Sequence, residues 1–269
     1  MSLLKKMHSK LATKAWVHYH TDFDVPETLY GPFPSREFEE VLESIPPSPQ
    51  VMVLKPLTLC NARGVRILHQ PTQGVWANPW VGGSSSLKEL REDVFKEVRG
   101  FLEHGRFIIE EYVRSHGSLS RMAPLPDASP VLRNVYWGDR FIGGLIHLPT
   151  LTSGGVGNLA KKANWMAFDA QGAIQRVPFT EYRSWGTSPY KELELPDYET
   201  WIKCKIRNWS TTKTGINSQI VPAVMQGLND MEKPFWAVDG ILNEAERFVI
   251  VEMEYPPGPV FKRVKPFME

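Results

Sequence analysis

Cysteine is scarce in this sequence, and several other features that mark particular protein classes are missing. Only two cysteines occur, Cys60 and Cys204, and they form no paired motif, so neither a disulfide framework nor a zinc site is expected. No apolar run is long enough to cross a bilayer, and residues 1–10 lack the apolar core of a secretion signal. These absences predict a cytoplasmic protein with no membrane partner.

An excess of charge of one sign is lacking as well. The 269 residues include 31 Lys and Arg against 30 Asp and Glu, which gives a net charge of +1. Without a basic excess we expect no nucleic acid partner. Neither a GxGxxG run nor a GxxxxGKS/T run occurs, which argues against Rossmann and P-loop nucleotide sites. A chain of this length suits one large domain or two closely packed lobes.

Hydrophobic periodicity is present and predicts the elements of the first half. Helical spacing marks three segments: 9–20, 35–45 and 86–105. Ser35 is the predicted cap of the second of these helices. Apolar runs of strand length mark three more: 51–56, 65–70 and 106–113. The irregular stretch 115–130 then predicts a boundary between two lobes, 1–114 and 115–269.

The second half reads as mostly antiparallel strands. Runs 131–137 and 140–148 flank Gly138-Asp139, which is a good signal for a two-residue hairpin turn. The other expected elements are hairpins at 165–177 and 235–255 and helices at 197–210 and 214–229. This order predicts an α+β fold in two lobes.

The last predicted hairpin carries an unusual group of acids. Glu252 and Glu254 lie two residues apart, so they share one face of the strand. A symmetric loop, centred between Ala245 and Glu246, would place Asp239 directly opposite Glu252. Opposed like charges destabilise a sheet. Three outcomes remain open: one acid is protonated, all three face solvent, or a hard cation such as Mg²⁺ lies between them.

Three further features each have two interpretations. Lys55 ends the strand VMVLK before a turn-rich loop, where it either reaches bound phosphate or lies along the surface. FIIEEYV, residues 107–113, is either part of a binding site or a plain edge strand. Asn158 follows a glycine-rich stretch and either contributes to a site or serves the turn.

Taken together and in this order, the motifs resemble the ATP-grasp superfamily. The segments that carry the resemblance are VMVLKP, ARGVRIL, FIIEEYV, VLRNVYWGDRFIGG, SGGVGNLAKKA, AVDG and VEMEYPPG. The resemblance covers roughly residues 9–260. The resemblance implies a two-lobed fold with antiparallel sheets and flanking helices, and ATP with Mg²⁺ between the lobes. Residues 133–201 look most like ATP-grasp proteins associated with sugar transfer.

The resemblance implies roles for residues of the first lobe. Lys55 would contact the α- and β-phosphates under the loop 57–64, which includes Arg63 and Gly64. Lys10, or else Lys14, would be a second phosphate-binding lysine. Four residues would form the hinge that presents backbone groups to adenine: Glu110, Glu111, Tyr112 and Val113.

For the second lobe the resemblance implies a metal site and an acceptor side. Asp239, Glu252 and Glu254 would hold one or two Mg²⁺ ions. Arg133 and Asn158 would line the γ-phosphate or the acceptor, and with Lys55 they are the candidate catalytic residues.

Parts of the family pattern are missing. Glu254 stands where Asn is usual, and Ala237 stands where an arginine is usual. The loop after Lys55 contains a single glycine, Gly64, where the family pattern often has more. No clear acidic partner for the ribose follows the hinge, and Asp127 is a poor substitute. A separate N-terminal domain is not found, so an acceptor would rest on the two lobes or on a partner chain, as in a homodimer.

The implied function is that of an ATP-dependent ligase. It would activate a carboxylate as an acyl phosphate for attack by an amine, on a small-molecule or peptide-like acceptor. Three alternatives stay open: an ATP-grasp kinase that phosphorylates an alcohol or sugar, a nucleotide-binding module without catalysis, and a protein unrelated to ATP.

Overall fold

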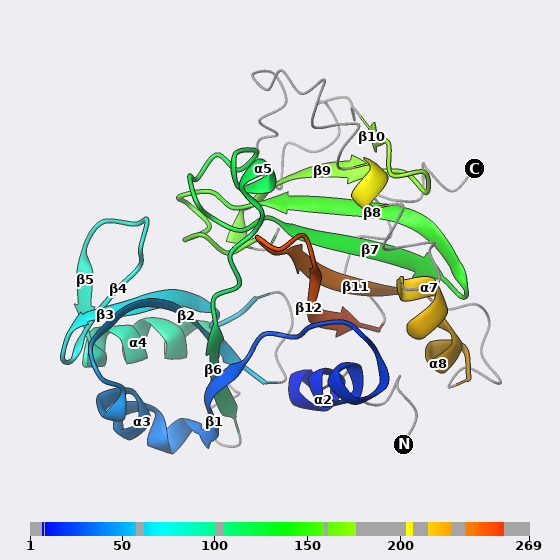
Figure 1. The fold of residues 1–269 in the computed structure, drawn as a ribbon. Helices are drawn as coiled ribbons and strands as arrows, with labels where there is room; N and C mark the ends of the chain where they lie inside the picture. The colour runs from blue at the N-terminus through cyan, green and yellow to red at the C-terminus, as the bar shows by residue number, and fades with distance from the viewer. Residues whose placement is uncertain are drawn as a thin grey trace.

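In a computed structural model, the described part of the chain contains two six-stranded sheets (Figure 1). Neighbouring strands within each sheet are antiparallel. The structure describes residues 7, 9–57, 62–99, 105–158, 161–175, 203–206, 215–226 and 235–255. Helices flank both sheets, so the predicted α+β class is confirmed. In the described part of the chain, no helix is both long and apolar enough to cross a membrane.

The first sheet has the strand order β1-β6-β2-β3-β4-β5. Its strands are β1 (Thr28–Pro34), β2 (Ser48–Pro56), β3 (Arg66–Thr72), β4 (Val75–Ala77), β5 (Ser84–Ser86) and β6 (Arg106–Glu111). Its helical segments are η1 (Ser35–Glu37), α3 (Phe38–Ser44) and α4 (Leu87–Glu97). The predicted strands β2, β3 and β6 are confirmed, whereas β1, β4 and β5 are additional.

Two details of the first sheet's helices differ from the sequence prediction. Ser35 does not cap α3, because it is buried one turn earlier in η1 and its Oγ donates to the Gly105 carbonyl oxygen at 3.0 Å. Helix α4 ends at Glu97, earlier than predicted, while its start is well fixed. There Ser86 and Glu89 form a reciprocal capping box that satisfies two free backbone N–H groups.

The second sheet has the strand order β10-β9-β8-β7-β11-β12. Its strands are β7 (Val131–Trp137), β8 (Arg140–Leu148), β9 (Asn164–Phe168), β10 (Ile174–Gln175), β11 (Phe235–Leu242) and β12 (Phe248–Glu254). The three predicted hairpins are thereby confirmed. The short helices α5 (Gly117–Ser120), α7 (Ile216–Gln219) and α8 (Val221–Gln226) accompany it, and residues 203–206 are also helical. The remaining parts of the two predicted helices, 197–202, 207–210, 214 and 227–229, lie outside the described residues.

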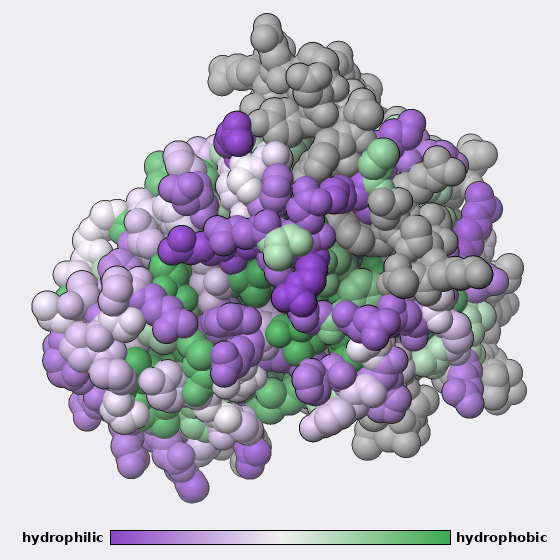
Figure 2. Space-filling model, viewed as in Figure 1, coloured by the Kyte–Doolittle hydropathy of each residue, from purple (hydrophilic) through white to green (hydrophobic). Residues whose placement is uncertain are grey.

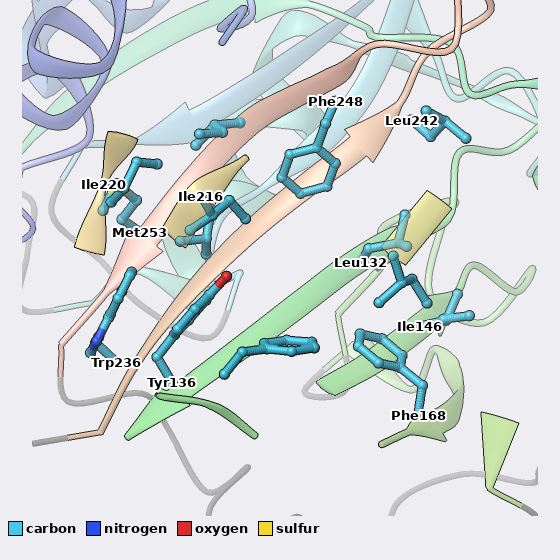
Figure 3. Close-up of a cluster of buried hydrophobic side chains, with 14 of the residues drawn as sticks. Leu132, Tyr136, Ile146, Phe168, Ile216, Ile220, Trp236, Leu242, Phe248 and Met253 are labelled. Carbon is cyan, nitrogen blue, oxygen red and sulfur yellow. The ribbon is translucent and has the colours of Figure 1, made fainter. Parts of the chain in front are cut away.

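The larger core covers one face of the second sheet (Figure 3). Alternation along β7 sends Leu132 and Tyr136 into it, and Tyr136 stacks on Trp236 of β11 with ring centroids 4.3 Å apart. Ile216 and Ile220 lie over this face in Figure 3. Because that face is apolar and covered, the opposite face of β7, β11 and β12 is the one that can carry charged residues.

Helix α2 (Lys10–His20) packs against the second sheet, although the residues that follow it in sequence form the first sheet. Trp16 and Val17 belong to the core of the second sheet, and the helix contacts β12 (Figure 1). Its start is fixed by Ser9, whose side chain accepts from the Ala12 N–H. Helix α2 therefore belongs by sequence to the proposed lobe 1–114 but packs on the proposed lobe 115–269.

Candidate functional site

A cavity lies between the two sheets, with walls from both. The first sheet contributes Lys55 and the end of β6, and the second contributes Asp239 and Glu252. Lys10 reaches it from the first turn of α2. In Figure 2 apolar residues show between the two lobes, surrounded by a mostly hydrophilic surface. The elements that carry the ordered motifs thus meet at one place.

Both walls of this cavity carry aliphatic side chains beside their charged groups. Val53 and Ile67 line it from the first sheet. Val131, Ile241 and Val251 line it from the second. Aliphatic side chains on two opposite walls suit a flat ring, because burial of apolar area stabilises a bound aromatic group by roughly 25 cal/mol per Å².

One buried carboxylate on the first sheet holds two lysines. Glu110 is 1% exposed and pairs across the sheet with Val53, so its side chain lies on the same face as Lys55. Lys55 Nζ forms a close ion pair with Glu110 Oε2, and Lys14 Nζ lies 2.8 Å from Oε1. Lys14 also donates to Thr28 Oγ1 at 2.9 Å. Burial lowers the pKa of Lys14, and the charge of Glu110 opposes that shift.

The two candidate lysines of α2 have different surroundings. Lys14 is buried against Glu110 and is not among the lining residues of the cavity. Lys10 lines the cavity, and its Nζ lies 3.1 Å from Glu252 Oε1. This placement favours Lys10 over Lys14 as the lysine that faces a bound ligand.

The acids of the last hairpin meet as the sequence predicted. Asp239 pairs with Glu252 across β11 and β12, and the next residue on that face, Glu254, pairs with Ala237. The loop is centred one half-residue earlier than predicted, and a bulge between Asp239 and Gly240 restores the register. Carboxylate oxygens of the three acids lie within 4.8 Å of one another.

Arg133 provides the positive charge between these acids. It pairs with Asp239 across β7 and β11, so the two side chains share a face. Its Nε donates to Asp239 Oδ1 at 2.7 Å, its Nη2 binds Oδ2, and its Nη1 lies 3.0 Å from Glu254 Oε2. Burial raises the pKa of Asp239, and Arg133 opposes that rise. Burial would lower the pKa of Arg133, but Asp239 and Glu254 raise it above its usual value.

The acid cluster fits a hard cation. Its donors are carboxylate oxygens from adjacent strands, the ligands that Mg²⁺ prefers, and two of the acids line the cavity. Asp239 is buried, while Glu252 and Glu254 are half-buried and open to an ion that keeps some of its waters. A bound cation would also reduce the repulsion among the three acids, which Arg133 and Lys10 offset only in part.

The predicted hinge connects the two sheets. Tyr112 N–H donates to the Val51 carbonyl oxygen at 3.3 Å, and its hydroxyl accepts from the Ser129 N–H at 2.7 Å. Ser129 Oγ donates to the Val113 carbonyl oxygen at 2.8 Å. Burial raises the pKa of the Tyr112 hydroxyl. The segment is thus fixed on both sides, and Glu110, Glu111, Tyr112 and Val113 all line the cavity.

The other predicted site residues are placed less uniformly. Asn158 lines the cavity together with Gly155, Val156 and Gly157. Arg63 is exposed and does not line it. Arg133 and Glu254 are also not among its lining residues, but Arg133 binds Asp239, which lines the cavity. Gly64 donates its N–H to Glu97 Oε2 at 2.8 Å. Residues 58–61 of the predicted phosphate loop lie outside the described residues.

One relevant residue did not emerge from sequence reasoning, and a second was given a different role. Ser129, which ties the hinge to the second lobe, carries no sequence signal of its own. Lys14 was considered only as a substitute for Lys10, although two lysines four residues apart share a helix face. That spacing could have indicated that both serve the same region.

Comparison with known proteins finds likenesses among solved structures only. No protein-family model matches the chain, and no curated protein matches it. A biotin carboxylase–β-γ-ATP complex from Campylobacter jejuni is 12% identical and has a TM-score of 0.46, with 98% of this chain and 44% of that chain covered. A D-alanine–D-alanine ligase from Bacillus anthracis complexed with ATP is 9% identical, with a TM-score of 0.41 and coverage of 94% and 56%.

A third solved structure is the macrocyclase MdnC bound with precursor peptide MdnA from Microcystis aeruginosa. It is 12% identical, with a TM-score of 0.41 and coverage of 100% of this chain and 58% of that one. The chain thus spans about half the length of these three proteins. The two antiparallel sheets with a cavity between them match the two-lobed arrangement that the sequence resemblance implied, and the ordered motifs lie around that cavity.

Proposed function

We propose that this protein binds ATP and Mg²⁺ between its two sheets and acts as an ATP-dependent ligase. It would activate a carboxylate as an acyl phosphate, which an amine then attacks. The acceptor would be a small molecule or a peptide-like molecule. One observation carries the proposal: a cavity with apolar walls has a lysine-rich cluster on one side and an acid-rich cluster on the other.

The lysine-rich side suits the phosphates of a nucleotide. An ammonium group has three donors, so Lys55 can keep its bond to Glu110 while it donates to a phosphate oxygen. In the same way, Lys10 can keep its ion pair with Glu252 while it donates to a phosphate oxygen. Both ammonium groups are already held at the cavity, so little rotamer freedom is lost when phosphate binds.

The acid-rich side suits the metal. Asp239, Glu252 and Glu254 would hold Mg²⁺, which supplies positive charge against the phosphate oxygens. Arg133 keeps the carboxylates of Asp239 and Glu254 apart and oriented. The apolar walls beside the hinge would take the adenine ring, and the backbone of residues 110–113 would meet its edge.

The proposed reaction needs no nucleophile from the protein. A carboxylate oxygen of the substrate attacks the γ-phosphorus, the bond to the bridging oxygen breaks, and ADP leaves. An amine then attacks the acyl carbon, loses a proton and releases inorganic phosphate. The protein orients the reactants and stabilises charge, which matches a site lined by lysines and acids. Ser129 also lines the cavity, but its hydroxyl donates to the Val113 carbonyl oxygen.

The first test is thermal unfolding with ATP or ADP, each with Mg²⁺ or with chelator. Ligand at a hundred times its dissociation constant stabilises by roughly 2.7 kcal/mol, and each kcal/mol raises the midpoint by about 2–4 °C. Glu252→Gln is the informative variant, because the Glu252 side chain is 30% exposed and its one ion pair among the described residues is that with Lys10. We expect it to lose the Mg²⁺-dependent shift. Glu92→Gln, on the exposed face of α4, is the control that keeps the shift.

Analysis of the products separates the ligase from its alternatives. ADP with a new amide supports the ligase, ADP with a phosphorylated acceptor means a kinase, and binding without turnover means a nucleotide-binding module. If the wild type shows no shift with any nucleotide and metal combination, the proposal is wrong.

A further inference from the structure

A short segment of the first lobe, Asn78 to Trp80, is bonded to the glycine-rich segment of the second lobe. Asn78 directly follows β4. Its Nδ2 donates to the Ile67 carbonyl oxygen of β3 at 3.1 Å and to the Gly154 carbonyl oxygen at 2.9 Å. One amide nitrogen therefore joins a strand of the first sheet to the segment that leads into residues 155–158, which line the cavity.

The oxygen of the same amide fixes the turn that follows Asn78. Its Oδ1 accepts from the Trp80 N–H at 2.9 Å and from the Val81 N–H at 3.0 Å. A side-chain amide offers two donor hydrogens and two acceptor lone pairs, so all four bonding positions of Asn78 are used. Because any rotation of this side chain would break hydrogen bonds, Asn78 holds the turn and Gly154 in one geometry.

Trp80, which this turn positions, packs on the next residue of the glycine-rich segment. Gly155 has φ +80°, and an added Cβ would lie 2.3 Å from the nearest atom of the Trp80 ring. Only a residue without a side chain lets the indole come this close to the backbone. The Trp80 ring also lies 5.6 Å from the Tyr112 ring of the hinge, measured between centroids. Trp80 thus contacts two elements that line the cavity.

The second lobe holds the other end of the glycine-rich segment. His147 Nδ1 lies within hydrogen-bond distance of the Gly157 carbonyl oxygen, at 3.1 Å. An added Cβ on Gly157 would lie 2.7 Å from Val131 Cγ2, and Val131 itself lines the cavity. The segment is therefore fixed by the first lobe at residues 154 and 155 and by its own lobe at residue 157.

We propose that Asn78 and Trp80 are positioning residues that set where residues 155–158 lie in the nucleotide cavity. Neither side chain lines the cavity, so both act through their neighbours rather than by contact with a ligand. Asn78 bonds Ile67, which lies in one wall, and Gly154, which adjoins the other, and so it fixes the separation of the two walls. The purpose of this contact rests on the proposed function.

Asn78→Asp separates this role from the local turn. Aspartate keeps the acceptor positions for the Trp80 and Val81 N–H groups, but an ionised carboxylate cannot donate to the two carbonyl oxygens. Amide hydrogen exchange without nucleotide reads out the effect in residues 153–156, whose N–H groups are hydrogen-bonded within their own turn and report local opening. We expect exchange there to rise by roughly fivefold to thirtyfold, the factor that corresponds to the loss of one or two hydrogen bonds.

The matched control is Asn243→Asp, which makes the same change of charge. Asn243 Oδ1 accepts from the Arg247 N–H at 2.9 Å in the turn between β11 and β12, and the residue does not line the nucleotide cavity. It should leave residues 153–156 unchanged. Unchanged exchange of these residues in Asn78→Asp overturns the inference. So does an equal rise in both sheets, because it would mean only a general loss of stability.

Titration with Mg·ATP tests the purpose of the contact. Asn78→Asp and Trp80→Ala should weaken nucleotide affinity and raise the KM for ATP by about fivefold to tenfold, while kcat changes little, because neither residue reaches the reacting atoms. Trp80→Phe should restore most of the affinity, since its ring still packs on Gly155. Wild-type affinity in Asn78→Asp overturns the positioning role. If the wild type binds no nucleotide, the proposed function fails, and the exchange result alone decides whether Asn78 holds the segment.

Discussion

The two charged clusters of the cavity are built in opposite ways. On the first sheet one carboxylate, Glu110, serves two ammonium groups, those of Lys14 and Lys55. On the second sheet the three carboxylates of the acid cluster share one guanidinium and one ammonium group, those of Arg133 and Lys10. Counted over these named groups, positive charges exceed negative charges by one in the first cluster, and negative charges exceed positive charges by one in the second.

This difference explains how ionic groups of both signs can occupy one cavity in a chain with nearly balanced charge. Burying a surplus positive charge costs free energy, and a bound anion lowers that cost. A bound cation does the same for a surplus negative charge. The proposed nucleotide with its metal ion would supply both.

The largest loss of stability is expected at Glu110, whose removal tests the difference between the two clusters most directly. Glu110→Gln leaves two buried ammonium groups without their carboxylate, and removal of one partner from a buried pair costs about 3–5 kcal/mol. Urea unfolding should show this loss. Glu111→Gln, at the neighbouring half-buried position, is the control and should cost far less. Adding Lys14→Met to Glu110→Gln should recover part of the loss, and no recovery would mean that Lys14 is not the source of the cost.

A smaller loss is expected when Asp239 is changed. In Asp239→Asn the guanidinium of Arg133 loses its two-point partner but keeps Glu254 at 3.0 Å. The cost of burying the Asp239 charge also disappears, so we expect a loss of about 1–3 kcal/mol in urea unfolding. A loss as large as that of Glu110→Gln would show that Glu254 does not compensate, and the charge surplus assigned to this wall would be wrong.

Patterns within single elements allowed much of this arrangement to be predicted. Period-two alternation placed Glu252 and Glu254 on one face, and the hairpin register placed Asp239 opposite Glu252. The partner of these acids was not evident in the sequence. Arg133 lies 106 residues from Asp239, and alternation gives the face of a strand but not its neighbours in the sheet. Only the strand order brings the two together.

The missed elements have a local explanation. The edge strand β1, TLYGPFP, contains two prolines and a glycine, residues that are depleted in strands and tolerated mainly at sheet edges. Strands β4 and β5 have three residues each, too few for a period to show. Helix α2 was identified correctly, but its packing on β12 depends on contacts remote in sequence.

A still smaller change in unfolding free energy is expected at Glu252, in the acid cluster of the second sheet. Glu252→Gln removes one of three clustered carboxylates and breaks a pair with Lys10 that is 30% exposed on the acid side. Relief of repulsion and loss of the pair oppose each other, so without Mg²⁺ the free energy of unfolding should change by less than about 1 kcal/mol. Denaturation curves with and without Mg²⁺ test this. A loss comparable to that of Asp239→Asn would mean that the wall carries no surplus of negative charge.

The smallest effect concerns Glu97, which also has two basic partners, Arg66 and Lys161, but is 34% exposed on its side chain. Its pKa of about 2 in the folded protein lies below the ordinary value of 4.5, because the folded state binds the proton more weakly. Its contribution to stability is therefore complete above pH 4.5 and is lost as the pH falls toward 2.

The measurement is the difference in unfolding free energy between wild type and Glu97→Gln across this range. We expect a constant difference of about 0.2–1 kcal/mol from pH 5 to 7 and its disappearance near pH 2. Since solvent screens this carboxylate and not Glu110, an equal number of basic partners should yield a much smaller effect. A difference as large as that of Glu110→Gln would show that the number of partners, rather than burial, sets the cost. A difference that grows as the pH falls would contradict the assigned direction of the pKa shift.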